Sequence, residues 1–311
     1  MVASEQETDP YVNGTIDLQP AFVLEGAITS AGPFKNPRDV AVAKDGSLYV
    51  ADTFNQRIIH FSQSGEVLKQ WGAASSQDGA EPGTFREPWG IAIAPDGSVL
   101  VADTWNHRIQ RFTADGKYLN EWGYFGQAEQ PDAFWGPRDV AVDSNNRVYV
   151  TDTGNKRVVI FNLDGKYITQ FGTAGMEKGM LDEPVGIAVG SDGNVYVADT
   201  WNQRVQVFIP DRTGLTYSAS LEWEIAGWYG QSTDNKPYLA VDAVGNVYVG
   251  DPEGYRVLVF DSLGTFKYTW GAYSAGIDGF GLVSGVAVAP DGTIWVCDAT
   301  NNRILKFSPP E

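Results

Sequence analysis

The sequence predicts an all-β fold: a six-bladed β-propeller of four-stranded antiparallel blades. The main observation is a repeated pair, an aspartate followed five residues later by an arginine. It occurs six times, at Asp52/Arg57, Asp103/Arg108, Asp152/Arg157, Asp199/Arg204, Asp251/Arg256 and Asp298/Arg303. Successive aspartates lie 51, 49, 47, 52 and 47 residues apart. A period of about 40–50 residues with four short strands in each copy is typical of a propeller blade.

Each copy reads as short strands joined by tight turns. In residues 90–112, Ile91 and Ile93 alternate with alanines, as in a strand that packs on both faces. The Pro-Asp-Gly at 95–97 suits a turn, because proline fixes φ and glycine accepts a positive φ. The second strand, second turn and third strand follow at 99–101, 103–107 and 109–112. A fourth strand ends near an aromatic-glycine pair in four copies, at Trp71-Gly72, Trp122-Gly123, Phe171-Gly172 and Trp270-Gly271.

The two ends of the chain carry complementary parts of one blade. Residues 21–26 resemble a fourth strand that lacks its first three, and residues 304–307 form a third strand with no fourth after it. We therefore expect the N-terminal strand to complete the last blade and close the ring. Residues 1–20 are expected to be an extended linker or lead-in, and residues 21–311 a single domain. The predicted blades are about 38–72, 89–123, 138–172, 185–227, 238–271 and 284–308 plus 21–26.

Composition limits the classes of partner. The net charge is −17, with 22 Lys+Arg against 39 Asp+Glu, so the chain has little with which to build a basic surface for nucleic acid. A single cysteine, Cys297, excludes an intramolecular disulfide, and no run of 18 apolar residues is present. The acidic residues 1–10 do not resemble a signal peptide. They suggest a linker or the trimmed start of a larger, membrane-tethered protein, and we expect a monomer.

The repeat resembles a known family. An Asp-Gly turn, a Val-Tyr-Val-Ala-Asp strand and an Asn-x-Arg-Val turn and strand occur together in residues 192–205. This pattern is similar to the NHL repeat, and the similarity covers about residues 21–308. The resemblance implies a six-bladed propeller and points toward the bacterial sensor and envelope proteins that carry such domains. The fifth copy departs most, with Val244, Pro252 and Gly254 at positions where other copies have Asp, Thr and Asn, so we expect irregular geometry there.

The six Asp/Arg pairs are interpreted as structural. One alternative is a ring of charges that forms a site. The other is that each arginine bonds carboxylates and carbonyls at the second turn of its own blade. Recurrence in all six copies favours the second, because one site rarely needs every copy.

Positions at which the copies differ are better candidates for a site. The inner strands begin Arg38-Asp39, Trp89-Gly90, Arg138-Asp139, Val185-Gly186, Pro237-Tyr238 and Ser284-Gly285. These residues should surround the mouth of the central channel, where glycine in every copy would satisfy packing. The candidate ligand contacts are therefore Arg38, Asp39, Trp89, Arg138, Asp139 and Tyr238, although the arginines and aspartates could instead pair with one another.

Aromatic residues form a second candidate set. Phe54, Trp105 and Trp201 vary within the second turn, and Trp135 lies in a neighbouring loop. Exposed aromatic faces beside carboxylates suit a sugar ring or a protein partner. The alternative is that they cover the rim between blades.

The sequence gives little support for catalysis. His60 and His107 cannot supply the histidine-rich zinc centre of the amidating lyases that this repeat class resembles, and no cysteine cluster exists. A calcium ion of the lactonase type would rest on Asp39 and Asp139 alone, so no cofactor is expected. The favoured interpretation is a non-enzymatic binding or sensor module for a protein, peptide or glycan, extracytoplasmic in a bacterium. The alternatives are a calcium-dependent hydrolase or lyase and a structural scaffold.

Overall fold

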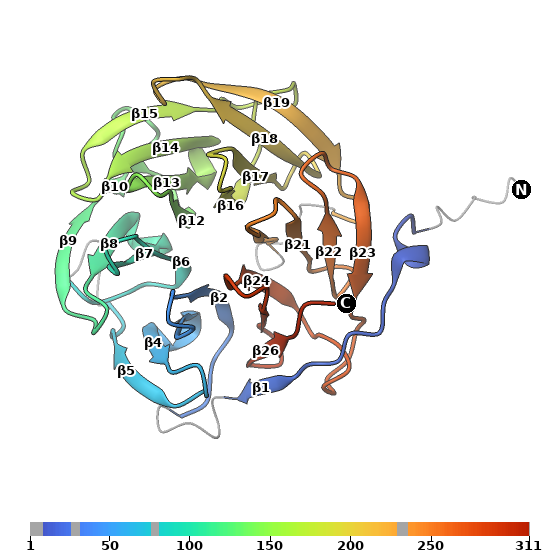
Figure 1. The fold of residues 1–311 in the computed structure, drawn as a ribbon. Coiled ribbons are helices and arrows are strands. Elements are labelled where there is room, and N and C mark those ends of the chain that lie inside the picture. The colour runs from blue at the N-terminus through green and yellow to red at the C-terminus, as the bar shows by residue number, and fades with distance from the viewer. Residues whose placement is uncertain (1–8, 26–31, 76–80, 229–235, 311) are drawn as a thin grey trace, which may run out of the picture.

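The fold is a ring of six four-stranded antiparallel sheets around a central axis (Figure 1), as predicted. The computed structural model describes residues 9–25, 32–75, 81–228 and 236–310. Within these ranges, no helix has the length and apolar character needed to span a membrane.

Blades 1 to 3 each contain four consecutive strands. Blade 1 has β2 (Pro37–Val42), β3 (Leu48–Asp52), β4 (Arg57–Phe61) and β5 (Val67–Trp71). Blade 2 has β6 (Pro88–Ile93), β7 (Val99–Asp103), β8 (Arg108–Phe112) and β9 (Tyr118–Trp122). Blade 3 has β12 (Pro137–Val142), β13 (Arg147–Asp152), β14 (Arg157–Asn162) and β15 (Tyr167–Phe171). A parallel pair, β10 (Tyr124–Phe125) and β11 (Ala133–Phe134), lies in the connection between blades 2 and 3.

Blades 4 to 6 repeat this order. Blade 4 has β16 (Pro184–Val189), β17 (Val195–Asp199), β18 (Arg204–Pro210) and β19 (Tyr217–Glu224). Blade 5 has β20 (Leu239–Val241), β21 (Val247–Asp251), β22 (Arg256–Phe260) and β23 (Phe266–Trp270). Blade 6 has β24 (Val283–Val288), β25 (Ile294–Asp298), β26 (Arg303–Phe307) and the N-terminal β1 (Phe22–Glu25).

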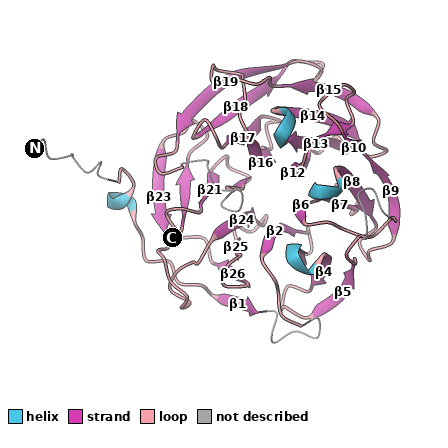
Figure 2. Cartoon of the chain, turned by 180° about the vertical axis from the view of Figure 1, so that it is seen from behind, coloured by secondary structure: helices cyan, strands magenta, loops and turns pink. Residues whose placement is uncertain are grey.

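The second turns of blades 1 to 3 are short 3-10 helices on one face of the ring (Figure 2). They are η3 (Thr53–Asn55), η4 (Thr104–Asn106) and η5 (Thr153–Asn155). Each is followed by a residue with a positive φ at the position before the repeat arginine. These turns and the loops that lead into the inner strands form the face on which the candidate residues lie.

The core consists of apolar layers between successive blades. One cluster joins Ala102 and Ile109 of blade 2 to Val148 and Phe161 of blade 3. The alternating pattern of each strand provides one side chain for the sheet in front and the next for the sheet behind. Each blade is therefore stabilised mainly by its two neighbours, which makes the ring closure important.

The N-terminal strand closes the ring, as predicted. β1 pairs antiparallel with β26, with Leu24 opposite Ile304 and Glu25 opposite Arg303. Leu24 is buried in the cluster between blades 6 and 1. The edge of β26 is thereby covered, and the first and last parts of the chain share one sheet.

Residues 9–20 differ from the extended lead-in that we expected. Tyr11 is buried against Phe260 and Phe266 of blade 5, and its hydroxyl accepts a hydrogen bond from the Ala226 amide at 3.1 Å. A short 3-10 helix, η1 (Val12–Gly14), follows Tyr11, and the Ile16 amide donates to the Thr269 carbonyl at 2.8 Å. The polar sequence, with its prolines and glycine, did not indicate this docking, because the docking depends on the single aromatic ring of Tyr11.

Asp9 completes the arginine network of blade 5. In blades 1 to 4 the repeat arginine reaches a Gln or Glu of the fourth strand, the partners being Gln70, Glu121, Gln170 and Glu222. Blade 5 has Thr269 there, and the Asp9 carboxylate binds Arg256 instead. This hydrogen bond lowers the pKa of Asp9. The inner strand of blade 5 has three residues where the others have six, so the predicted irregularity is confirmed.

Deleting residues 1–26 should lower the melting temperature sharply, because it uncovers the edge of β26 and removes Leu24 and Tyr11 from the core. A finer test is Leu24→Ala, expected to reduce the free energy of unfolding by about 2–5 kcal/mol. Its matched control is Glu25→Ala, at the exposed neighbouring position, expected to change it by only about 0.5 kcal/mol. Equal effects of the two substitutions in urea unfolding would contradict closure through β1.

Candidate functional site at the channel mouth

The six Asp/Arg pairs are structural, as interpreted from their recurrence. In each pair the arginine Nε lies 2.7–2.9 Å from the aspartate Oδ2, and every one of these aspartates is fully buried. In five blades the aspartate Oδ1 accepts the backbone N–H of a residue in the preceding loop, namely Lys35, Arg86, Trp135, Asp182 and Gly281. The pairs therefore hold the loops of the candidate face in place.

The inner strands alternate between glycine and a larger residue around the channel. A Cβ at Gly90 would lie 2.6 Å from the Cα of Asp139, and one at Gly285 would lie 2.6 Å from the Cα of Asp39. A Cβ at Gly186 would lie 2.7 Å from the Cα of Tyr238. Each glycine thus admits the backbone of the following blade. The expectation that glycine in every blade would satisfy packing is therefore wrong, because the larger residues Asp39, Asp139 and Tyr238 fill the channel in the other three blades.

Asp39 and Asp139 join neighbouring blades rather than lining an open cavity. Asp39 accepts the N–H groups of Val40 and of Ile91 in the next blade, at 2.8 and 2.9 Å. Asp139 accepts those of Val140 and Ile187 at 2.7 and 2.9 Å. Burial raises the pKa of Asp39 to about 7. It raises that of Asp139 well above its ordinary value, with a further contribution from the charge of Asp39.

A stack of one tryptophan and two arginines lies at the mouth. The Cζ atoms of Arg38 and Arg138 lie 4.4 and 3.8 Å from the ring centroid of Trp89, which is buried. A guanidinium over an indole face is a favourable cation–π arrangement. Burial lowers the pKa of Arg138 to about 10, so the group remains charged at neutral pH. Glu87 Oε2 accepts the indole N–H of Trp105 at 3.0 Å beside this stack.

A pocket of about 400 Å³ opens beside the stack, between blades 2, 3 and 4. Two of its polar groups are paired: Glu183 with Lys236 of blade 5 at 2.7 Å, and Lys156 with Asp182 at 2.8 Å. The lining residues are Trp105, Trp135, Gly136, Arg138, Thr153, Gly154, Lys156 and Glu183. The pocket therefore combines a buried guanidinium, a partly exposed carboxylate and two indole rings.

The indole rings continue into an exposed aromatic surface. Trp135 is 42% exposed and its ring lies 6.4 Å from that of Phe125, which is 56% exposed. Gly154 makes room for Trp135, since a Cβ there would lie 2.5 Å from the indole Cγ. We name Trp105, Phe125 and Trp135 the aromatic platform.

The structure brings some predicted residues together and separates others. Trp105, Trp135 and Arg138 line one pocket, and Arg138 in turn stacks on Trp89, which also contacts Arg38. Phe54 and Trp201 are exposed on blades 1 and 4 and do not line it. Tyr238 is buried in the channel, its hydroxyl donating to the Arg138 carbonyl at 3.2 Å.

Sequence reasoning missed four charged residues of the mouth: Glu87, Lys156, Glu183 and Lys236. Glu87 and Glu183 both precede the proline that begins an inner strand, with φ of 50° and 47°. The signal available in the sequence was a charged residue directly before the proline that begins the inner strand. Blades 2 and 4 have a glutamate at this position, whereas blades 1 and 3 have the smaller, uncharged Asn36 and Gly136.

The described residues do not assemble a metal centre. No group of three or more His, Cys, Asp or Glu side chains in the described ranges could hold an ion. His107 Nδ1 accepts the Gly136 amide at 3.0 Å, and His60 lies in a different pocket. Asp39 and Asp139 are fully buried and each bonds two backbone N–H groups. Neither a zinc nor a calcium site fits this donor set, so no reaction step is assigned to a metal.

The NHL repeat model matches residues 34–61, 85–112, 134–161, 181–208 and 280–307. The chain carries five NHL repeats on a six-bladed propeller. The copy without a match is blade 5, which has the short inner strand.

This NHL propeller is similar in sequence to animal enzymes over part of its length. It is 42% identical over 87 residues to peptidyl-glycine alpha-amidating monooxygenase of Mus musculus, covering 27% of the chain and 9% of the enzyme. It is 32% identical over 115 residues to peptidyl-alpha-hydroxyglycine alpha-amidating lyase 1 of Drosophila melanogaster, covering 34% and 21%. Human NHL repeat-containing protein 3 is 34% identical over 109 residues, covering 33% and 30%. The propeller thus spans less than a third of these relatives.

Solved structures share the fold. A streptogramin B lyase superposes with a TM-score of 0.60 at 16% identity, over 92% of this chain and 96% of the other. A gluconolactonase from Xanthomonas campestris gives 0.62 at 18% identity, over 88% and 87%. Identities this low establish the architecture alone.

The favoured interpretation from the sequence, a non-enzymatic binding or sensor module, is wrong. Two of the three relatives reported above are amidating enzymes, among them the one with 42% identity, which favours the enzyme alternative. The count of two histidines bears on a histidine-rich metal centre. It does not bear on the carboxylate, ammonium and guanidinium groups that the loops bring to the mouth.

Replacing Trp89 with alanine should destabilise the NHL propeller by about 3–5 kcal/mol, because a buried indole is lost and two guanidinium groups lose the ring between them. The matched control is Trp201→Ala on the same face, where the ring is 46% exposed, with an expected change of about 0.5 kcal/mol. Denaturant unfolding measures both. Similar losses of unfolding free energy in the two variants would show that the stack of Trp89 with two arginines does not stabilise the fold more than an exposed indole does.

Asp39 should make stability depend on pH. Its pKa is about 7 in the folded protein and about 3.9 when unfolded, so the folded state binds the proton more tightly. The stabilisation is fully present below about pH 4 and is lost as the pH rises to about 7. Asp39→Asn cannot titrate, so its destabilisation relative to wild type should be larger at pH 5 than at pH 8. Urea unfolding at both values tests this, with Asp164→Asn, at a carboxylate that is 85% exposed, as control; an equal cost of Asp39→Asn at both would refute it.

Proposed function

We propose that this NHL propeller is a lyase that cleaves a carbon–nitrogen bond in a substrate bearing a carboxylate beside that bond. The observation that carries the proposal is the pocket at the channel mouth, where the buried guanidinium of Arg138 and the carboxylate of Glu183 line one cavity. The identity of 32–42% to amidating enzymes over part of the chain supports the same class.

The fly relative's name gives the substrate type, a peptide that ends in α-hydroxyglycine. For this chain we propose an N-acyl-α-hydroxyglycine of the same kind. Arg138 would bind the substrate carboxylate through paired N–H donors, the geometry that guanidinium groups favour. Lys156 at the pocket wall adds a second positive charge in a chain whose net charge is −17. The aromatic platform would hold the acyl group.

Glu183 is proposed as the general base. Its carboxylate takes the proton of the substrate hydroxyl; the O–H electron pair forms the C=O bond of glyoxylate, and the N–Cα bond breaks. The amide nitrogen receives the electron pair of that bond and takes the proton back from Glu183. The products are the acyl amide and glyoxylate, so atoms and charge balance. Proton transfer of this kind contributes about 10²–10⁴-fold to rate.

Lys236 would hold the Glu183 carboxylate in the correct orientation. The two groups lie 2.7 Å apart, and the Lys236 side chain is buried. The base is thus on blade 4 and its orienting cation on blade 5. The narrower comparison with bacterial sensor or envelope domains forms no part of the proposed function, because the relatives reported above are animal proteins, two of them amidating enzymes.

Incubation of the purified chain with N-benzoyl-α-hydroxyglycine should release glyoxylate and benzamide, measured by chromatography. Glu183→Gln should lower kcat by about 10²-fold or more with little change in KM, because only the proton transfer is lost. Arg138→Met should chiefly raise KM, since it removes the carboxylate contact. Circular dichroism establishes that both variants fold.

The matched control is Tyr273→Ala, an exposed aromatic residue outside the pocket, which should leave kcat/KM unchanged. Absence of turnover by the wild-type chain would overturn the lyase assignment. Turnover that survives Glu183→Gln would overturn the role of that residue while leaving the reaction in place.

A further inference from the structure

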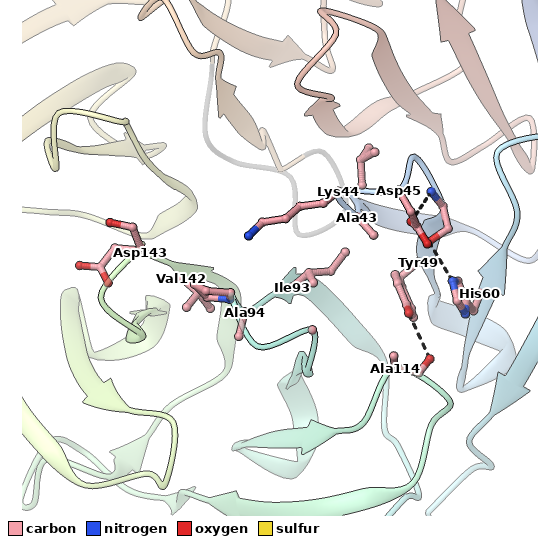
Figure 3. A pocket seen from close by; sticks show the side chains of 15 residues that line it. Ala43, Lys44, Asp45, Tyr49, His60, Ile93, Ala94, Ala114, Val142 and Asp143 are labelled. Atoms are coloured by element: carbon pink, nitrogen blue, oxygen red, sulfur yellow. Dashed lines mark hydrogen bonds between the residues drawn. The ribbon is translucent and has the colours of Figure 1, made fainter.

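A further cavity lies at the other end of the channel from the mouth. Its volume is about 700 Å³, within the range of small-molecule sites. Val42, Ile93 and Val142, the last residues of the inner strands of blades 1, 2 and 3, provide apolar walls, and each is only half-buried. Figure 3 shows these strands converging on the cavity.

The polar groups on one side of this cavity already bond one another. The Ser47 hydroxyl donates to Asp45 Oδ1 at 2.7 Å, and His60 Nε2 lies 3.0 Å from the same hydroxyl (Figure 3). The His60 ring stacks on Tyr49, with centroids 3.9 Å apart. Because the one Ser47 proton is directed to Asp45, His60 Nε2 must be the donor in its contact.

The same arrangement recurs in blade 2, which identifies it as part of the fold. There Ser98 donates to Asp96 at 2.6 Å, and Arg111 Nε donates to the Ser98 hydroxyl at 2.9 Å. His60 therefore occupies the position of a cation in the repeat. On the far wall, Asp143 accepts the Asn145 and Arg147 amides and the Tyr149 hydroxyl. These acids need no ligand.

Lys44 is different. No ion pair in the described ranges involves it, and the repeat does not require it, because the corresponding positions hold uncharged residues: Pro95, Ser144, Ser191, Ala243 and Pro290. Its side chain extends away from Asp45 and His60, with the ammonium group toward the side of the cavity where Asp143 lies (Figure 3). Lys44 is exposed, and its position beside apolar walls allows its ammonium group to pair with a ligand of opposite charge that has an apolar body.

We propose that this cavity is a second binding site, and that it binds a small molecule with an apolar body and one carboxylate. The half-buried aliphatic residues receive the apolar body, and Lys44 pairs with the carboxylate. A ligand with several negative charges is disfavoured, because Asp45 and Asp143 also line the cavity. The site is independent of the reaction proposed at the channel mouth.

Octanoate and octanamide test the charge requirement, because they share the chain and differ in the head group. Isothermal titration calorimetry of the full chain should show octanoate binding with a stoichiometry of one. Octanamide should bind at least tenfold more weakly. Lys44→Met should reduce octanoate affinity to that of octanamide, whereas Lys166→Met, an exposed lysine of blade 3 outside the cavity, should not change it.

Two further variants locate the ligand. Val142→Asp places a charge in the apolar wall and should abolish binding of both probes in a chain that circular dichroism shows to be folded. Arg138→Met, at the opposite mouth, should leave octanoate binding intact. Equal affinity for the two probes, no binding of either, octanoate binding that survives Lys44→Met, or its loss in Arg138→Met would each overturn the proposal.

Discussion

The buried aspartate at the end of each second strand is the interaction on which the rest of the propeller depends. One carboxylate oxygen accepts the arginine Nε of its own blade, and in five blades the other accepts a loop amide. The loops fixed in this way carry Trp135 and Glu183 to the channel mouth. A carboxylate buried without these partners would be strongly unfavourable, so the charge network and the loop positions form together. The surface chemistry of the mouth is therefore set by a buried ion pair.

Much of the fold follows from local patterns that a sequence displays directly. The repeat, its turns and the two incomplete ends predict six blades and the closure through β1, because strand pairing depends on residues that recur at fixed spacing. The docking of residues 9–20 could not be predicted in the same way. It rests on Tyr11 filling a space beside blade 5 and on Asp9 replacing a partner that Thr269 is too short to provide. Both depend on tertiary proximity.

The candidate site was likewise predictable from the sequence only in part. Differences between repeats drew attention to Trp105, Trp135 and Arg138, and the structure gathers these three around one pocket. Glu183 and its partner Lys236 were not predicted, because their contact joins two adjacent blades and neither residue stands in a recognisable motif. The preference for the enzyme alternative over a binding module rests on the animal relatives. Residue counts address a histidine-rich metal centre and do not address chemistry that needs only carboxylate and guanidinium groups.

The alternation of glycine with larger residues around the channel gives the ring a lower symmetry than its six blades suggest. Gly90, Gly186 and Gly285 each face the larger residue of the following blade. The interchangeable module is therefore a pair of adjacent blades, and three such pairs make the ring. Moving a single blade by one position would set two large side chains against each other at one junction and leave a void at another. Shuffling or duplication of this chain would preserve packing only in steps of two blades.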